Sequence, residues 1–448
     1  MADKAAWPPA PPKDENEGER AARLEAEREA KRISDEIDRA LEQERQELRK
    51  RRPQTKILLL GQSESGKSTM VKNFQLYFCP TTFYAEAEAW RAVIHLNLVR
   101  HVNHILELLS TSDSPPGKQI PNKDYRVLQM RLSPLKQVEL ILTRALSAEA
   151  SNSSSTSPTA EKSTWRPDRV TEVSIRGGSG WKALMRKRRG SIARLPTIPD
   201  EVDDARRILD ACKDDVVALW KAQEPGNLED GSADHGRYFL NNAARVSDIK
   251  YIPTADDILR ARLRTLGVEE YRMAMETAAA EKGTEWVFYD VGGARSQRAA
   301  WASYFDDVNA MIFLCPISGF NQQLAEDVFV NRLADSMELW STVCKSKLLA
   351  NATFILLLNK ADLLAAKLKA GLKFEDFAPS YRGRPNKAEY VAEYLREQMM
   401  ATHRFSSPKK RQLHVHVTCA IDTNLMGVVL TSVRDVILID TLQHTTLL

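Results

Sequence analysis

Cysteine is scarce in this chain: its 448 residues contain five cysteines, far apart and never in a Cys-x-x-Cys pair. That spacing excludes a disulfide framework and is typical of a reducing, intracellular compartment. No apolar run approaches the roughly 18–20 residues of a membrane-spanning helix. The N-terminal MADKAAWPPAPP has neither the apolar core of a signal peptide nor a glycine after Met for myristoylation. The net charge of +4 is nearly balanced, so overall charge does not favour nucleic acid as a partner.

Residues 56–69, KILLLGQSESGKST, match the phosphate-binding pattern G-x-x-x-x-G-K-[ST]. The pattern predicts a short strand, a tight loop from Gly61 and a helix that begins near Lys67. Gly61 and Gly66 allow successive backbone N–H groups to point at one anion, and the positive helix end adds to this. Lys67 would then reach the β- and γ-phosphates, and Ser68 would hold Mg²⁺. The alternative is a chance turn, which the coincidence of strand, loop, Lys and Ser disfavours.

The N-terminal region, 1–53, has two compositions. Residues 1–17 are rich in proline and polar residues, which predicts a disordered tail. Residues 19–52 lack Pro and Gly, and their apolar residues recur at helical spacing, which predicts a helix of about 34 residues and roughly 50 Å. This helix is too polar to be buried, so it is either a solvated arm, which the composition slightly favours, or a partner-binding rod.

A mainly helical block, 85–255, follows the phosphate-binding loop. Helical spacing is found at 86–109, 126–148 and 202–221. Between the last two, 150–198 is rich in Ser, Thr, Gly and basic residues, which predicts a flexible insertion. The RRGS ending at Ser191 fits the substrate pattern of basophilic kinases, but a solvated basic loop is the favoured interpretation.

The C-terminal part alternates short apolar runs with helical stretches. We expect strands at 271–277, 286–290, 311–316, 353–359 and 414–419, and helices at 326–346, 387–401 and 424–442. This alternation predicts an α/β fold with a parallel sheet. Because the first strand is separated from the others by the helical block, we predict an α/β domain formed by 54–84 and 256–448, with 85–255 inserted as a helical domain.

Three further motifs follow these strands, at the edge where ligands bind in open α/β sheets. In DVGG at 290–293, Asp290 fits an acid that supports Mg²⁺, and Gly293 allows its N–H to approach a γ-phosphate. In NKAD at 359–362, the Asp362 carboxylate can accept two hydrogen bonds, from guanine N1–H and its 2-amino group, and adenine offers no such pair of donors. In TCA at 418–420, a backbone N–H can meet guanine O6. Each motif alone is weak, but the four in this order indicate a guanine nucleotide.

Together these motifs resemble heterotrimeric G-protein α subunits, of a divergent fungal type. The resemblance covers most of residues 30–448 apart from the insertion, and includes YIPT at 251–254 and DILRARLRT at 257–265, which are similar to the family's linker and first switch. It implies a Ras-like P-loop GTPase domain and an all-helical domain that closes over the nucleotide. It also implies an N-terminal helix that docks on a βγ dimer and a C-terminal tail, 442–448, that reads receptors.

The resemblance implies roles for single residues. Ser68 and Thr265 would ligate Mg²⁺ together with phosphate oxygens and waters. Arg262 would be the catalytic arginine that stabilises charge on the transferring phosphoryl group. In G-protein α subunits and related enzymes, such an arginine generally raises the rate of hydrolysis by roughly 10³–10⁵. The residues implied to bind GTP or GDP are Gly61, Glu64, Ser65, Gly66, Lys67, Ser68, Thr69, Leu259, Arg260, Arg262, Thr265, Asp290, Gly293, Asn359, Lys360, Asp362, Cys419 and Ala420.

Two departures from the family pattern concern hydrolysis. Where the family has a glutamine that orients the attacking water, this chain has Ala294. Loss of such a group costs roughly 10²–10⁴ in rate, about 3–5 kcal/mol. Ser63 replaces the usual glycine and points toward the γ-phosphate and the water. Both changes predict slow GTP hydrolysis; the alternative is that Gln297 or Ser63 itself positions the water.

A third departure concerns location. Ala2 replaces the lipid-bearing glycine of the family, and the first cysteine is Cys79. Membrane contact would then come from a βγ partner or from the basic residues 50–52, at about 1 kcal/mol each. We therefore expect a cytoplasmic protein with peripheral contact at the inner face of the plasma membrane, made through its partners: a βγ dimer, a G protein-coupled receptor and an effector.

Two functions remain open. One is a guanine-nucleotide switch that hydrolyses GTP slowly, and the other is a nucleotide-stabilised partner-binding module with little or no GTPase activity. Arg262 and Thr265 favour the switch, because a purely structural site needs no catalytic arginine, whereas Ala294 and Ser63 favour the module. A P-loop kinase or ATPase is disfavoured by Asp362, which selects guanine.

Overall fold

The computed structural model describes residues 54–110, 122–147, 174–176, 198–222, 233–277, 285–305, 308–324 and 326–445, with parts of 18–39. It divides into two units, 1–54 and 55–448, which we describe separately. In the first unit, residues 31–39 form a continuous helix. Arg32 pairs there with Glu29 at 2.7 Å and Glu36 at 3.3 Å, and Ile33 and Ile37 are exposed. The predicted helix therefore exists over its described residues.

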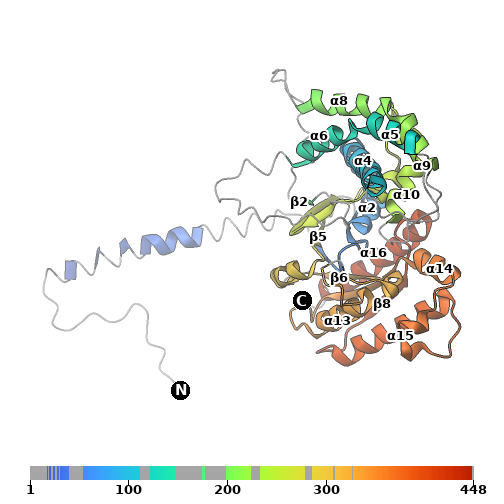
Figure 1. Cartoon of the computed structure of the whole chain (residues 1–448). Coiled ribbons are helices and arrows are strands. Elements are labelled where there is room, and N and C mark those ends of the chain that lie inside the picture. The colour runs from blue at the N-terminus through green and yellow to red at the C-terminus, as the bar shows by residue number, and fades with distance from the viewer. Residues whose placement is uncertain are drawn as a thin grey trace. The chain divides into compact units, whose positions relative to one another are not determined.

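A six-stranded sheet organises the second unit, in the order β4-β5-β1-β6-β7-β8 (Figure 1). Strands β1, β6, β7 and β8 run parallel, and β4 pairs antiparallel with β5. The strands are β1 (Gln54–Leu60), β4 (Val268–Ala274), β5 (Glu285–Val291), β6 (Ala310–Pro316), β7 (Thr353–Asn359) and β8 (Leu413–Val417). The near-continuous apolar runs of β6 and β7 follow from burial of both sheet faces.

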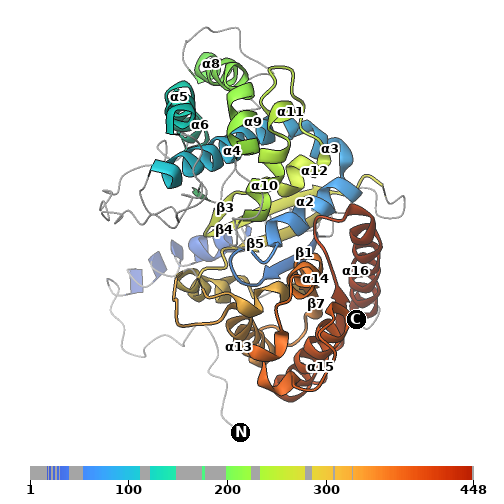
Figure 2. The same ribbon diagram turned by 45° about the vertical axis from the view of Figure 1, so that its right-hand side comes forward.

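Successive side chains of β1 point to opposite faces of the sheet, and each face is covered by helices (Figure 2). Ile57 and Leu59 join a core with α2 and α16, and Leu58 and Leu60 join a second core with α13, α14 and α15. These helices are α2 (Lys67–Phe78), α13 (Arg332–Lys345), α14 (Ala361–Lys369), α15 (Ala388–Ser406) and α16 (Thr423–Thr445). The α/β fold class predicted from the sequence is confirmed, but β4 runs antiparallel in a sheet that was expected to be parallel.

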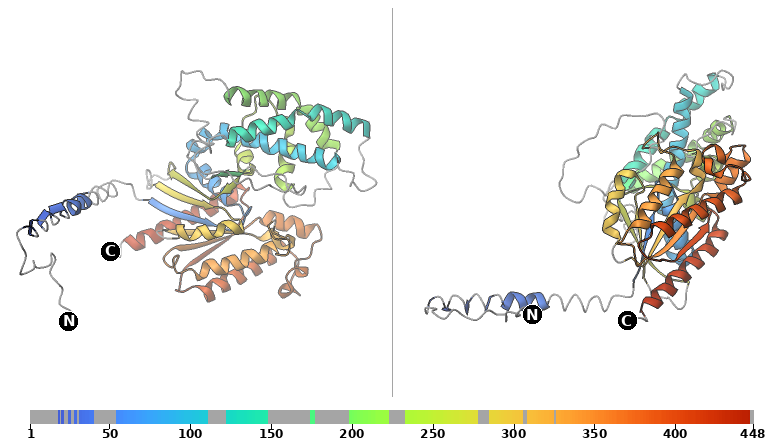
Figure 3. Two further views of the ribbon diagram at one scale, coloured as in Figure 1. Left: turned by 60° about the vertical axis from the view of Figure 1, so that its left-hand side comes forward. Right: turned by 90° about the horizontal axis from the view of Figure 1, so that it is seen from below.

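A third core of buried apolar side chains lies entirely among residues 83–261. It is built by helices that pack side by side around α4, as Figure 3 shows. They are α3 (Pro80–Ala85), α4 (Ala87–Ser110), α5 (Asn122–Leu132), α6 (Leu135–Ser147), α8 (Ile198–Ala211), α9 (Lys213–Ala222), α10 (Ala233–Asn241), α11 (Ala243–Val246) and α12 (Ala255–Arg260). Among the described helices, none is both long and apolar enough to cross a bilayer.

Several predicted helix boundaries are wrong. The stretch 126–148 is two helices, since Pro134, which has no N–H to donate, follows the end of α5 and precedes α6. The stretch 202–221 is also two, and Asp214 and Asp215 in the first turn of α9 favour a new helix start there. The helix predicted from 326 begins at Arg332, because the Asn331 side chain accepts from two backbone N–H groups and caps it. The helix predicted over 387–401 continues to Ser406.

Other predictions fall largely outside the described residues. In the insertion at 150–198, the structure describes a strand, β2 (Ser174–Arg176), which pairs in parallel with β3 (Arg264–Leu266), and the start of α8. The Ser191 motif, residues 1–17, the basic residues 50–52 and the last three residues of the tail all lie outside.

Candidate nucleotide-binding site

The phosphate-binding loop requires glycine at both of its glycine positions. Gly61 has φ +142° and Gly66 has φ +103°, which L side chains rarely adopt. A Cβ at Gly61 would lie 2.4 Å from the Leu314 carbonyl oxygen, and one at Gly66 would lie 2.4 Å from Asn359 Nδ2. The loop thus passes directly against β6 and β7, and α2 begins at Lys67 as predicted.

Lys67 lies over its own loop. Its Nζ donates to the Gly61 carbonyl at 2.9 Å and to the Gln62 carbonyl at 2.8 Å. The side chain is buried, and burial lowers its pKa to about 8 against the opposing charge of Asp290. An anion placed at the start of α2 would meet this ammonium together with the positive end of the helix dipole.

Ser68 and Asp290 form the candidate Mg²⁺ position. The Ser68 hydroxyl donates to Asp290 Oδ2 at 2.5 Å, and Asp290 is fully buried near the end of β5. A hydroxyl beside a carboxylate is an all-oxygen set that fits Mg²⁺. Thr265 belongs to β3, but its side chain lies outside the described part of the structure.

Asn359 joins three parts of the site. At the end of β7, its Nδ2 donates to the Ser65 carbonyl at 2.8 Å, and its Oδ1 accepts from the Ala420 N–H at 3.1 Å and from the Thr418 hydroxyl at 3.3 Å. Asn73 of α2 adds a bond of 2.7 Å to the Ala420 carbonyl. The phosphate-binding loop, NKAD and TCA therefore meet at one edge of the sheet, as predicted.

The residues expected to face the base lie next to this junction. Lys360 has φ +64°, and burial together with the nearby Arg332 charge lowers its pKa to about 8. Asp362 is in the first turn of α14. Burial and the Asp362 carboxylate raise the pKa of the Cys419 thiol to about 11, so Asp362 and the TCA loop are neighbours.

DVGG packs against the phosphate-binding loop. A Cβ at Gly293 would lie 2.2 Å from the carbonyl carbon of Gln62 and 2.3 Å from Ser63 N, so only glycine allows this approach. Ala294 follows, 3% exposed, and precedes the 3₁₀-helix η3 (Arg295–Tyr304). Gln297 folds back, and its Oε1 lies 1.8 Å from where a Cβ on Gly292 would be.

These four motifs occur in one chain and meet at one site. A model of the family described as G-protein alpha subunit matches residues 31–437. The chain belongs to the G-protein alpha subunit family. Members of this family are guanine-nucleotide-binding signalling proteins with GTPase activity.

Some curated relatives match nearly the whole G-protein α chain, and others match about half of it. It is 31% identical to the guanine nucleotide-binding protein alpha-4 subunit of the fungus Mycosarcoma maydis, over 97% of this chain and 94% of the relative. It is 28% identical to the guanine nucleotide-binding protein G(o) subunit alpha of Geodia cydonium, over 94% of this chain and 97% of the relative. The alpha-15 subunit of Caenorhabditis elegans is 41% identical over 45% of this chain and 54% of its own.

Arg262 of this G-protein α chain is engaged with the phosphate-binding loop. Its guanidinium hydrogen-bonds the Glu64 carboxylate, and Arg332 contacts the other Glu64 oxygen at 3.2 Å. Burial alone would raise the pKa of Glu64, but the two guanidiniums outweigh it and hold that pKa at about 2. Leu259 is buried in α12, and the Arg260 guanidinium lies 4.4 Å from the Tyr238 ring centroid.

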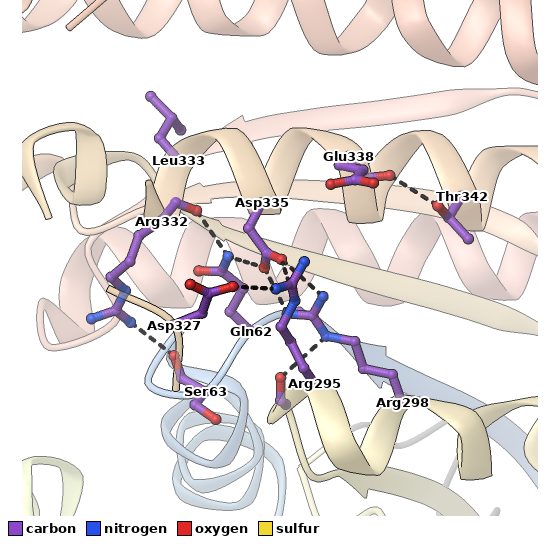
Figure 4. A network of polar contacts seen from close by, with 12 residues as sticks. Gln62, Ser63, Arg295, Arg298, Asp327, Arg332, Leu333, Asp335, Glu338 and Thr342 are labelled. Atoms are coloured by element: carbon purple, nitrogen blue, oxygen red, sulfur yellow. Dashed lines mark hydrogen bonds and ion pairs between the residues drawn. The ribbon is translucent and has the colours of Figure 1, made fainter. Parts of the chain in front are cut away.

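A polar network around Asp335 was not anticipated (Figure 4). Gln62 hydrogen-bonds Asp335 and the Arg332 carbonyl, while Arg298 and Arg295 reach the same carboxylate at 2.6 and 3.4 Å. The network connects the phosphate-binding loop, η3 and the first turn of α13. The signal in the sequence was the Asn331 cap, which places Arg332 and Asp335 in the first turn of a helix beside the site.

Proposed function

We propose that this G-protein α subunit binds GTP and GDP with Mg²⁺, couples a receptor to an effector and hydrolyses GTP slowly. One observation carries the slow hydrolysis: Ala294, buried directly after Gly293, which packs on the phosphate-binding loop, offers only a methyl group.

The phosphate and base contacts divide among the four motifs. The loop N–H groups and Lys67 would hold the phosphates, and Asp362 would accept from guanine while a backbone N–H of the TCA loop faces O6. Ser68 and Thr265 would hold Mg²⁺, and Asp290 would fix the Ser68 hydroxyl, which it contacts at 2.5 Å. When bound, Mg²⁺ would neutralise charge on the phosphate oxygens.

Catalysis in this proposal rests on charge stabilisation without an oriented water. Arg262 is held at the loop by Glu64, from which it could turn to a phosphoryl group, so the electrostatic part of the site is present. The methyl of Ala294 cannot hydrogen-bond a water, and Ser63 adds a side chain beside the same space. Loss of the water-orienting group corresponds to roughly 10²–10⁴ in rate.

Gln297 is the residue that could replace the missing glutamine. Its Oε1 lies against Gly292, next to the glycine expected to approach the γ-phosphate. Gln297→Ala tests this directly. An unchanged single-turnover rate is expected, and a drop of tenfold or more would mean that Gln297 orients the water.

Separate cores support the proposed domains. One core lies within 83–261, and the two sheet-face cores draw on residues before 80 and after 267. We assign 54–84 and 256–448 to a Ras-like domain and 85–255 to an inserted helical domain. The N-terminal helix would bind a βγ dimer, the C-terminal tail a receptor, and membrane contact would be peripheral and through these partners.

The second candidate is a nucleotide-stabilised partner-binding module. It is favoured by the Glu64–Arg262 ion pair, through which the arginine joins the segment after α12 to the phosphate-binding loop without taking part in any chemistry. The nucleotide released from freshly purified, denatured protein separates slow hydrolysis, which both candidates share, from ordinary turnover. Slow hydrolysis predicts mostly GTP; mostly GDP would mean ordinary turnover, and adenine nucleotide would overturn both.

A further inference from the structure

Arg262 lies between two elements of regular structure. The chain leaves α12 at Ala261, which has ψ 130°, and β3 begins at Arg264. The backbone N–H and C=O of Arg262 therefore need partners from elsewhere in the protein, because buried peptide groups are rarely left unpaired.

Asn97 supplies both partners. Its Oδ1 accepts from the Arg262 N–H at 2.7 Å, and its Nδ2 donates to the Arg262 carbonyl at 3.0 Å. Asn97 is 7% exposed and lies in the middle of α4, between the fully buried Leu96 and Leu98. A side-chain amide that pairs with both sides of one residue fixes the position and the orientation of its Cα.

Lys72 holds the preceding turn. From α2, its Nζ donates to the carbonyls of Ile258 at 2.9 Å and Ala261 at 2.8 Å, and it lies 4.0 Å from the Trp90 ring centroid. The segment that carries Arg262 is thus fastened to α2, the helix of the phosphate-binding loop, and to α4 of the helical core.

We propose that Asn97 is a positioning residue for Arg262, acting on its backbone so that the guanidinium can reach the transferring phosphoryl group. This inference rests on the proposed catalytic role of Arg262. Both bonds of the Asn97 amide go to the backbone of Arg262, so Asn97 sets where the side chain starts while Glu64 holds where it ends.

The expected effect is large, because misplacing a catalytic group by about 1 Å costs roughly 10²-fold in rate. Asn97→Ala removes both bonds and should slow single-turnover GTP hydrolysis by that order. Asn97→Asp keeps the acceptor for the Arg262 N–H but sets a carboxylate oxygen against the Arg262 carbonyl, so its rate should also fall below that of the wild type. Asn103→Ala is the matched control: it lies on the same helix and bonds Glu139 of α6 at 2.8 Å, and it should leave the rate unchanged.

The test is a double-mutant cycle in the full chain, measured as single-turnover GTP hydrolysis and as GTP dissociation. If Asn97 acts through Arg262, Asn97→Ala slows hydrolysis in the otherwise wild-type protein. In an Arg262→Ala background, the same change lowers the hydrolysis rate by less than about twofold more. GTP dissociation should change less than hydrolysis, which a general loosening of the helical core would not produce.

Each contrary outcome has one meaning. If Arg262→Ala leaves the rate unchanged, the proposed catalytic function fails. If Arg262→Ala is slow but both Asn97 variants hydrolyse like the wild type, only this inference is wrong. Equal losses from Asn97→Ala in both backgrounds also overturn it in favour of a structural role. If Asn97→Ala does not fold, Asn97→Asp carries the same cycle.

Discussion

Replacing Asn359 with alanine should weaken GDP binding sharply. The change removes hydrogen bonds to the Ser65 carbonyl, the Ala420 N–H and the Thr418 hydroxyl, at 2.8, 3.1 and 3.3 Å. Ser65 is fully buried and Ala420 is 9% exposed, so neither backbone group gains much water in exchange. The phosphate-binding loop and the TCA loop lose their shared anchor.

The magnitude follows from the two backbone groups. Leaving a buried backbone group without its partner costs about 1–3 kcal/mol, so the two groups together cost about 2–6 kcal/mol of binding free energy before the loops relax. Even the lower limit corresponds to roughly 30-fold in affinity, since about 1.4 kcal/mol is tenfold. The equilibrium dissociation constant for GDP, measured by competition with a fluorescent guanine nucleotide, should rise by at least that factor.

Asn386→Ala is the control for this prediction. Asn386 also makes two backbone hydrogen bonds, from the Phe374 N–H at 3.0 Å and to the Leu372 carbonyl at 2.9 Å, but away from the site. It should bind GDP within about threefold of the wild type. Wild-type affinity in folded Asn359→Ala protein would refute the reasoning.

Two further predictions concern the loop and the helical core. Gly66→Ala forces φ +103° on alanine and places its Cβ 2.4 Å from Asn359 Nδ2, so GTP affinity should fall more than tenfold. Gly371→Ala is the control, because Gly371 has φ +98° but open space around it. Equal GTP affinities of the two variants would contradict the clash. Burial, reinforced by the charges of Arg91 and Arg206, lowers the pKa of His95 to about 3 in the folded protein. Its pKa in the unfolded chain is near 6.5, so between pH 3 and pH 6.5 the unfolded state binds more protons. Unfolding free energy should therefore rise with pH by up to about 1.4 kcal/mol per unit in that window. Urea unfolding of His95→Gln should show a flatter dependence, and the same slope as wild type would contradict the assignment.

Local patterns in the sequence carried much of the fold and the site. Strand β7 has the bounds expected from its apolar run, residues 353–359, because a buried parallel strand and the motif that ends it are both local signals. The loop glycines followed from the phosphate-binding pattern, and the meeting of NKAD with TCA followed from parallel strands, whose carboxyl ends share one edge.

The remaining features depend on contacts between residues distant in the chain. Gln62 reaches Asp335 across 273 positions, and Asn97 reaches Arg262 across 165, so no spacing rule relates the partners. The helix expected from 326 was placed by composition, whereas the Asn331 side chain decides where α13 begins. Pairing of β2 with β3 likewise joins two segments whose sequences give no sign of each other.

In the proposed mechanism, the buried methyl of Ala294 stands where hydrolysis needs a water-orienting group. Single-turnover GTP hydrolysis of the wild type against Ala294→Gln tests it most directly, with Arg262 intact in both. We predict that Ala294→Gln hydrolyses GTP faster by roughly 10²–10⁴-fold. A wild type that turns over GTP as quickly as Ala294→Gln would contradict the account.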